Sequence, residues 1–136
     1  MTLIDTSAWV EFLRATGSEV HHHLRGLIES EATLHTTDVV VMEVLAGARD
    51  QPHLASLRRL LSRCDFVPVA GLSDFESAAE LYRRCRRGGE TVRALNDCLI
   101  AAVALRAGLD LLAADRDFDV LVRHTELRRD RDRGPT

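Results

Sequence analysis

The chain has 136 residues, of which 46% are hydrophobic, and its formal net charge is −3. This length suits one domain with a sizeable core, and the charge excludes a protein that is basic overall, as many nucleic-acid binders are. The longest uninterrupted apolar run, Cys98 to Leu105, is too short to cross a membrane, and the first residues lack a secretory signal, so we expect a soluble cytoplasmic protein.

Short apolar runs alternate with stretches of helical periodicity along most of the chain. In chain order we expect a strand at 2–4, a helix capped by Thr6 or Ser7, a helix at 19–29, a strand at 32–36, helices at 38–48 and 52–63, a strand at 66–69, helices at 73–86 and 95–107, a strand at 110–113, a helical turn at 118–121 and a fifth strand at 121–124. Gly108 is expected to end the very apolar helix that begins at Leu95.

This alternation predicts an α/β fold with a central, mainly parallel sheet of four or five short strands flanked by helices. We expect a single domain at residues 1–127. The charged residues 128–136, which end in Gly-Pro-Thr, are expected to form a flexible tail. In a parallel sheet, binding sites lie beyond the carboxyl ends of the strands.

Acidic residues stand at the edges of the apolar segments. They are Asp5, Glu43, Asp97, Asp115 and Asp117. Any one of them, taken alone, reads most simply as a helix cap or a turn residue. Together they form a pattern, because carboxylates beside a core are costly to desolvate and repel one another. A hard divalent cation such as Mg²⁺ removes both costs, so the pattern predicts a metal-dependent reaction.

Basic residues cluster around Gly88-Gly89. Arg84, Arg86, Arg87 and Arg93 flank this pair, and Arg116 lies beside the last acidic residues. These five arginines are candidate RNA-phosphate contacts. The alternative is a solvated helix end, where cations are favourable in any case. The three cysteines have neither disulfide-framework nor zinc-site spacing.

Four segments resemble the motifs of PIN-domain ribonucleases, and in particular the VapC-type toxins of bacterial type II toxin–antitoxin modules. They are LIDTSAWVEFL, VVVMEVLAGA, RRGGETVRALNDCLIAAVAL and LLAADRDFDVL, and the resemblance covers about residues 2–124. It implies a PIN-like three-layer sandwich. It also implies an endoribonuclease that uses Mg²⁺, with Mn²⁺ as a substitute, and cleaves structured RNA such as tRNA or rRNA.

By motif, the resemblance assigns the metal site to the five acidic residues. Asp5, Asp97 and Asp115 are expected as direct ligands, and Glu43 and Asp117 as ligands bound directly or through water. Thr6, Ser7 and Asn96 are expected to support them, Asn96 either as a helix cap or through a hydrogen bond to a ligand or substrate. Which of Asp115 and Asp117 points at the metal is left open. The family usually has Thr or Ser before the last acidic motif, where this chain has Ala113-Ala114.

The resemblance further implies a cognate antitoxin that covers the active site, and a homodimer. A non-catalytic PIN-like module that binds RNA or a protein is the alternative, although the acidic set is complete. A haloacid-dehalogenase-type phosphatase fits poorly, because Asp5 is not followed by a second Asp and the chain has no lysine for the usual basic role.

Overall fold

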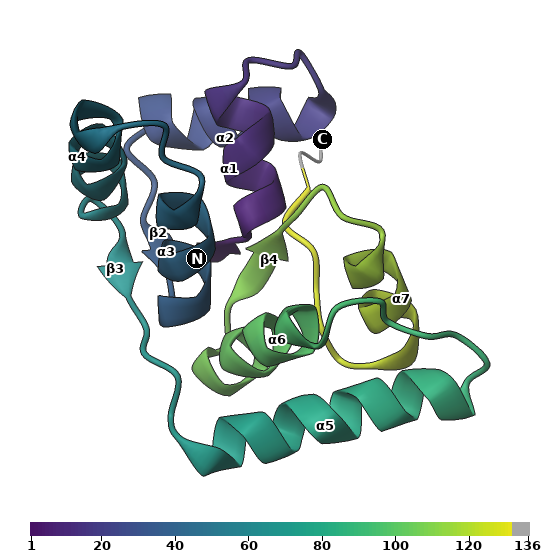
Figure 1. Ribbon diagram of the computed structural model, residues 1–136. Helices are drawn as coiled ribbons and strands as arrows, with labels where there is room; N and C mark the ends of the chain where they lie inside the picture. Colours follow the sequence, from purple (N-terminus) through teal and green to yellow (C-terminus); the bar gives the residue numbers. More distant parts are fainter. Residues whose placement is uncertain (132–136) are drawn as a thin grey trace.

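A four-stranded parallel sheet forms the centre of the protein (Figure 1). The computed structural model describes residues 1–131. The strands are β1 (Thr2–Ile4), β2 (Leu34–Thr36), β3 (Asp65–Phe66) and β4 (Asp110–Leu112), in the order β3-β2-β1-β4. All three pairings are parallel. The predicted α/β fold with a parallel sheet and flanking helices is confirmed.

Seven helices surround the sheet in the described part of the chain. They are α1 (Thr6–Leu13), α2 (Glu19–Glu29), α3 (Asp38–Ala46), α4 (Gln51–Leu61), α5 (Leu72–Arg87), α6 (Leu95–Ala107) and α7 (Asp117–His124). The long helix α5 lies outermost along α6 (Figure 1). Within the described residues, no helix combines the length and the apolar character that crossing a bilayer requires.

Helix α6 is the most buried of the described helices, and residues 97–104 are all buried. A helix that is apolar all round belongs in a core, and α6 contacts β4, α5 and α7. It ends where the sequence predicts, because Gly108 adopts the left-handed conformation with φ of 68° that is typical of a residue just after a helix. Strand β1 is buried between β2 and β4.

The strand order places a topological switch point at β1. The chain moves from β1 to β2 and β3 in one direction, whereas β4 lies on the other side of β1. The crevice at the carboxyl ends of β1 and β4 is therefore the expected place for a site. The two strands are in register, with Thr2 opposite Asp110 and Ile4 opposite Leu112.

Two predicted strands need correction. Residues 121–124, expected as a fifth strand, belong to helix α7. Phe118 and Leu121 are fully buried, and their spacing of three suits one face of a helix that packs on α6 rather than a strand. The strand expected at 66–69 is shorter and begins earlier, because only Asp65 and Phe66 pair with β2, and both are exposed.

The packed part of the chain continues past the predicted domain boundary at 127. Arg129 pairs in parallel with Leu111; the backbone N–H of Leu111 donates to the Arg128 carbonyl at 2.9 Å, and that of Asp130 donates to the Leu111 carbonyl at 2.8 Å. The Arg129 guanidinium also contacts Asp119. Residues 132–136 of the predicted tail lie outside the described residues.

Candidate metal centre

The carboxyl ends of β1 and β4 bring the first and the last acidic motifs together. Asp5 follows β1 directly, and its backbone N–H donates to the Leu112 carbonyl at 2.9 Å. Asp115 lies just beyond the end of β4. The parallel register of the two neighbouring strands therefore places both acidic residues at the switch point of the sheet.

Asp5 is held by the first turn of the helix that it caps. It is the N-cap of α1, and its Oδ2 accepts hydrogen bonds from the Ser7 backbone N–H at 2.9 Å and from the Ser7 hydroxyl at 2.5 Å. Ser7 Oγ in turn accepts from the Ala114 N–H at 2.9 Å. Ser7 thus links the end of β4 to Asp5, and it supplies a hydroxyl beside Ala113-Ala114, where the family's usual Ser or Thr is missing.

Glu43 comes to the same place from α3. The Thr6 hydroxyl donates to Glu43 Oε1 at 2.9 Å, so the first turn of α1 orients carboxylates from two elements. This hydrogen bond joins two residues that are 37 positions apart in the chain. It places the Thr6 hydroxyl where it can orient the Glu43 carboxylate. Glu43 and Asp5 line the same depression, so the two carboxylates belong to one site.

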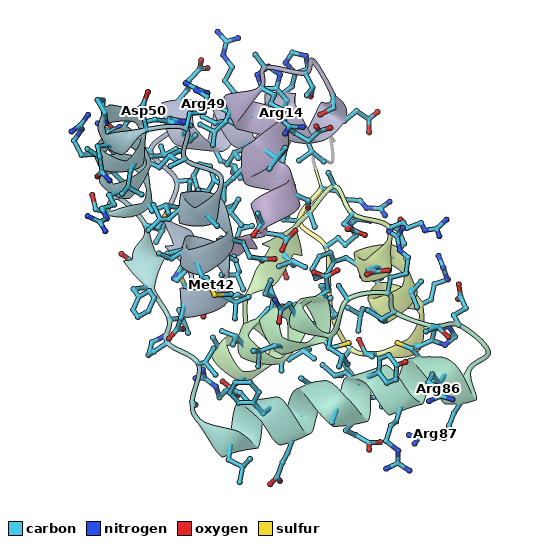
Figure 2. The ribbon with its side chains drawn as sticks, viewed as in Figure 1. Arg14, Met42, Arg49, Asp50, Arg86 and Arg87 are labelled. Atoms are coloured by element: carbon cyan, nitrogen blue, oxygen red, sulfur yellow. The ribbon has the colours of Figure 1, made fainter. Side chains whose placement is uncertain are left out.

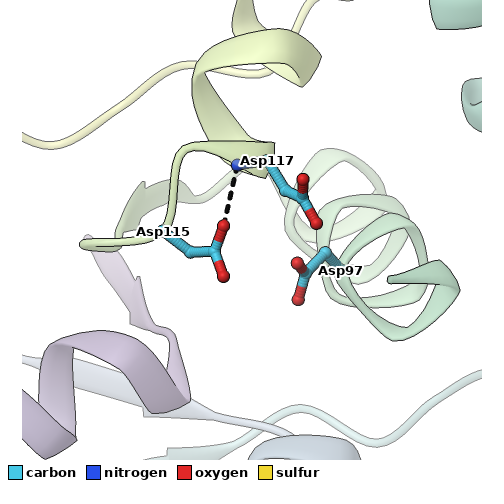
Figure 3. A group of neighbouring side chains, drawn as sticks. All are labelled: Asp97, Asp115 and Asp117. Atoms are coloured by element: carbon cyan, nitrogen blue, oxygen red, sulfur yellow. Dashed lines mark hydrogen bonds between the residues drawn. The ribbon is translucent and has the colours of Figure 1, made fainter. Parts of the chain in front are cut away.

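Asp97, Asp115 and Asp117 converge from three segments (Figure 3). Each offers a carboxylate oxygen, and these oxygens all lie within 4.8 Å of one another. Asp97 stands in the first turn of α6, Asp117 is the first residue of α7, and Asp115 lies in the loop between β4 and α7. Asp115 Oδ1 accepts from the Asp117 backbone N–H at 2.8 Å, which fixes the loop.

Burial and repulsion by neighbouring carboxylates make ionisation of Asp97 and Asp5 unfavourable. Burial, followed by a hydrogen bond with Asp117 and the charges of Asp5 and Asp115, raises the pKa of Asp97 to about 8. Burial is also the largest cause that raises the pKa of Asp5 to about 6, although Ser7 acts in the opposite direction. A divalent cation would favour the charged forms.

Asp117 differs from its neighbours because it is committed to the protein backbone. Its oxygens accept from the N–H groups of Arg93 and Ala94, each at 3.1 Å, and from Arg93 Nε at 3.2 Å. Burial raises the pKa of Asp117, but these hydrogen bonds and one from Asp97 lower it below its usual value. Ala94, the N-cap of α6, has no side chain able to cap the helix. Asp117, which is distant in sequence, instead accepts the backbone hydrogen bonds of Arg93 and Ala94.

An open depression of about 470 Å³ exposes one side of the cluster. It is lined by Asp5, Thr6, Ser7, Val10, Glu11, Glu43, Asp97, Ala114 and Asp115. Four of the five predicted carboxylates reach it, and a set of hard oxygen donors fits Mg²⁺ or Mn²⁺. Glu11 was missed by the sequence reasoning; its signal is its place four residues after Ser7 on the same helix face. Asp117 instead lines an adjoining depression of about 440 Å³ with Arg93, Arg116 and Arg123.

The chain matches the family model described as PIN domain over residues 2–123. It belongs to the PIN-domain family. It is also 47% identical, over 93% of its length and 96% of theirs, to ribonuclease VapC11 of Mycobacterium tuberculosis and to VapC ribonuclease Mb1587 of Mycobacterium bovis.

Solved structures show the same PIN fold at lower sequence identity. VapBC2 of Rickettsia felis bound to a promoter DNA fragment has a TM-score of 0.72 at 19% identity, with 95% of this chain and 96% of that chain covered. VapC20 of M. tuberculosis, described as a sarcin-ricin loop cleaving toxin, has a TM-score of 0.68 at 22% identity, with 94% and 99% covered.

The candidate RNA-binding arginines of this PIN domain fall into two groups. Arg84 pairs with both oxygens of Glu126 at 2.9 and 3.1 Å, Arg87 pairs with Glu80 at 2.8 Å, and Arg86 lies over the Tyr82 ring. Arg86 and Arg87 mark the carboxyl end of α5 (Figure 2). The helix-end interpretation accounts for these three arginines.

Arg93 and Arg116 form the other group, because they line the depression that Asp117 shares. Asn96 is exposed in the first turn of α6. Its expected role as a helix cap is wrong, since the N-cap is Ala94 and Asp117 supplies the hydrogen bonds to the segment that precedes the helix.

The free energy of unfolding of the metal-free protein is expected to fall as the pH rises from about 5 to 9. Unfolded aspartate has a pKa of about 3.9, whereas the pKa values of folded Asp5 and Asp97 are raised to about 6 and about 8. The folded state therefore holds more protons in this window, and its stability is lost as the pH passes through the raised values. For Asp5 alone the loss is about 3 kcal/mol in all, of which about 1.4 kcal/mol falls above pH 5.

Urea unfolding in EDTA at several pH values measures this loss. The lowered pKa of Glu90, about 2, acts in the opposite direction but only below about pH 4, outside the window. Saturating Mg²⁺ should flatten the profile. A metal-free stability that is constant or rises between pH 5 and 9 would contradict the expectation.

Proposed function

We propose that this protein is a Mg²⁺-dependent endoribonuclease, with Mn²⁺ able to substitute, and the toxin of a type II toxin–antitoxin pair. One observation carries the proposal: Asp5, Glu43, Asp97 and Asp115 line a single open depression at the switch point of the sheet. The ribonuclease activity is supported by the 47% identity to VapC ribonucleases over nearly the whole chain.

The side chains divide the work of phosphodiester hydrolysis among themselves. Asp5, Asp97 and Asp115 would hold the metal directly, whereas Glu43 and Asp117 would bind it directly or through water. Ser7 orients Asp5, and Thr6 orients Glu43. A bound divalent ion lowers the pKa of its water and offsets negative charge on the phosphate, so a histidine base is not required.

Structured RNA, such as tRNA or rRNA, is the proposed substrate, which places the activity in the cytoplasm. Arg116 is exposed, and its side chain forms no ion pair within residues 1–131. Together with Arg93 it offers positive charge next to the carboxylates, where RNA phosphates would approach. Recognition of an RNA loop would then depend on the surface around the depression.

The proposed protein partners are a cognate antitoxin and a second copy of the chain. Met42 and Leu95 are exposed apolar residues. Met42, on α3, directly precedes Glu43 (Figure 2), and Leu95 lies two positions before Asp97. An antitoxin that covers the depression would bury such residues. Structures of toxin–antitoxin complexes among those with this fold support the antitoxin. Exposed Phe66, Leu72 and Phe75 support a further interface, for which a homodimer is proposed.

Cleavage of a labelled pool of tRNA and rRNA fragments tests the proposal. The purified protein is incubated with the pool in Mg²⁺, in Mn²⁺ and in EDTA, beside Asp5→Asn. We expect discrete cuts that require the metal and are lost in the variant. Stabilisation by Mn²⁺ without any cut in the pool, or in total cellular RNA, would favour the non-catalytic binding module instead.

A further inference from the structure

Arg93 places a guanidinium on the acidic cluster. Its Nη2 lies 3.1 Å from Asp115 Oδ1, and its Nε lies 3.2 Å from Asp117 Oδ1. The side chain is 56% exposed, so it lies on the surface of the cluster and not beneath it. The same residue lines the adjoining depression that contains Arg116. One arginine therefore contacts both the carboxylates and the neighbouring basic surface.

The contact with Asp115 puts the guanidinium against a carboxylate that metal binding would need. Asp115 Oδ1 already accepts from the Asp117 backbone N–H, and the guanidinium is its second donor. A carboxylate oxygen has about two lone pairs, so Oδ1 is fully used, and a metal ion on Asp115 would bind the other oxygen, beside the guanidinium. Two cations a few ångströms apart also repel each other strongly in a partly buried site.

The loop that holds Arg93 is fixed independently of the guanidinium. Asp117 accepts from the backbone N–H groups of both Arg93 and Ala94. Glu90 accepts from Arg123 at 2.9 and 2.6 Å and forms a hydrogen bond with His124 at 2.9 Å. The side chain of Arg93 can therefore leave the cluster without moving the loop, and Asp117 keeps two backbone donors.

We propose that Arg93 is a placeholder cation, whose guanidinium neutralises Asp115 in the metal-free protein and moves to an RNA phosphate in the adjoining depression when a divalent ion binds. This exchange rests on the proposed function. It accounts for an arginine that contacts the cluster and is nevertheless 56% exposed, because a side chain that moves to a substrate must be able to leave the carboxylates.

Mn²⁺ affinity is the first test, because it needs no RNA. Arg93→Met removes the competitor, and Mn²⁺ binding measured by electron paramagnetic resonance or calorimetry is expected to tighten roughly threefold to tenfold. Arg25→Met is the matched control: Arg25 is 60% exposed, pairs with a single glutamate on α2 and carries the same charge. It should leave Mn²⁺ affinity within about a factor of two of the parent value.

The exchange itself is visible by nuclear magnetic resonance. In unaltered protein, Mg²⁺ should shift the Arg93 Nε–H signal and increase its exchange with water, while the backbone N–H signals of Arg93 and Ala94 remain protected. In steady-state cleavage, Arg93→Met should raise KM about tenfold and change kcat little, because it removes a substrate contact. The KM of Arg93→Lys should fall between those of the parent and Arg93→Met.

Each outcome decides the inference. If the parent binds Mn²⁺ and Arg93→Met binds it equally or more weakly, the exchange is overturned and the proposed function stands. The same conclusion follows if Mg²⁺ leaves the Arg93 Nε–H signal unchanged. If the parent binds no Mn²⁺ at all, the proposed function and the exchange are overturned together.

Discussion

Asp97→Asn is expected to reduce RNA cleavage at least about 1000-fold while making the metal-free protein more stable at pH 8. Asp97 is only 8% exposed, and its neighbours Asp5 and Asp115 disfavour its charge. Asparagine has the same shape, carries no charge and can donate to Asp117, but it is a poor ligand for a hard divalent ion. We expect a gain of about 2 kcal/mol in the free energy of unfolding.

Cleavage rates and urea unfolding in EDTA at pH 8 measure both effects in one preparation. Asp65→Asn is the control. It is the same substitution, made on exposed β3, where the side chain of Asp65 is 70% exposed. It should leave cleavage and stability close to the parent values. If Asp97→Asn instead destabilised the metal-free protein, the repulsion that we infer at the cluster would be wrong.

Asp117→Ala is expected to have the opposite effect on stability. The change removes the acceptor for the backbone N–H groups of Arg93 and Ala94, which have no helix cap of their own. We expect a loss of about 2 kcal/mol in the free energy of unfolding. Cleavage should fall about 100-fold, because the segment that leads to Asp97 loses its anchor.

The comparison with Asp115→Ala separates a ligand from a positioning residue. Asp115 lines the same depression as Asp5 and Asp97, and its side chain is 36% exposed. Its removal should weaken Mn²⁺ binding and should cost less metal-free stability than Asp117→Ala, because it removes the acceptor of one backbone N–H instead of two. Thermal unfolding and Mn²⁺ titration of both variants give the answer. Equal stability of the two variants in EDTA would remove the distinction between Asp115 and Asp117 that the hydrogen bonds suggest.

Local patterns in the sequence were sufficient for the framework of the protein. The alternation of apolar runs predicts the parallel sheet, and the rule that sites lie beyond strand ends predicts that Asp5 and Asp115 meet. The apolar run and the glycine at 108 define α6 to the residue. These features depend on periodicity and on residues near each other in the chain, which a single sequence displays directly.

The remaining features depend on contacts between distant residues. Asp117 is predicted only as a ligand, because the backbone N–H groups that it also accepts from, those of Arg93 and Ala94, lie more than twenty positions earlier in the chain. The link between Ser7 and Ala114 spans 107 positions. The strand expected at 121–124 is a helix because α6 offers a surface for Phe118 and Leu121, and such tertiary effects override local preference.

The pairing of β1 with β4 also determines when the enzyme can become active during its own synthesis. Asp5 is among the first residues to be made, but its strand gains its neighbour on one side only when residues 110–112 are available. The other carboxylates of the site, those of Asp97 and Asp115, are also made late in translation. Because such contacts must wait for distant parts of the chain, the nuclease stays inert on the ribosome until most of it has been translated.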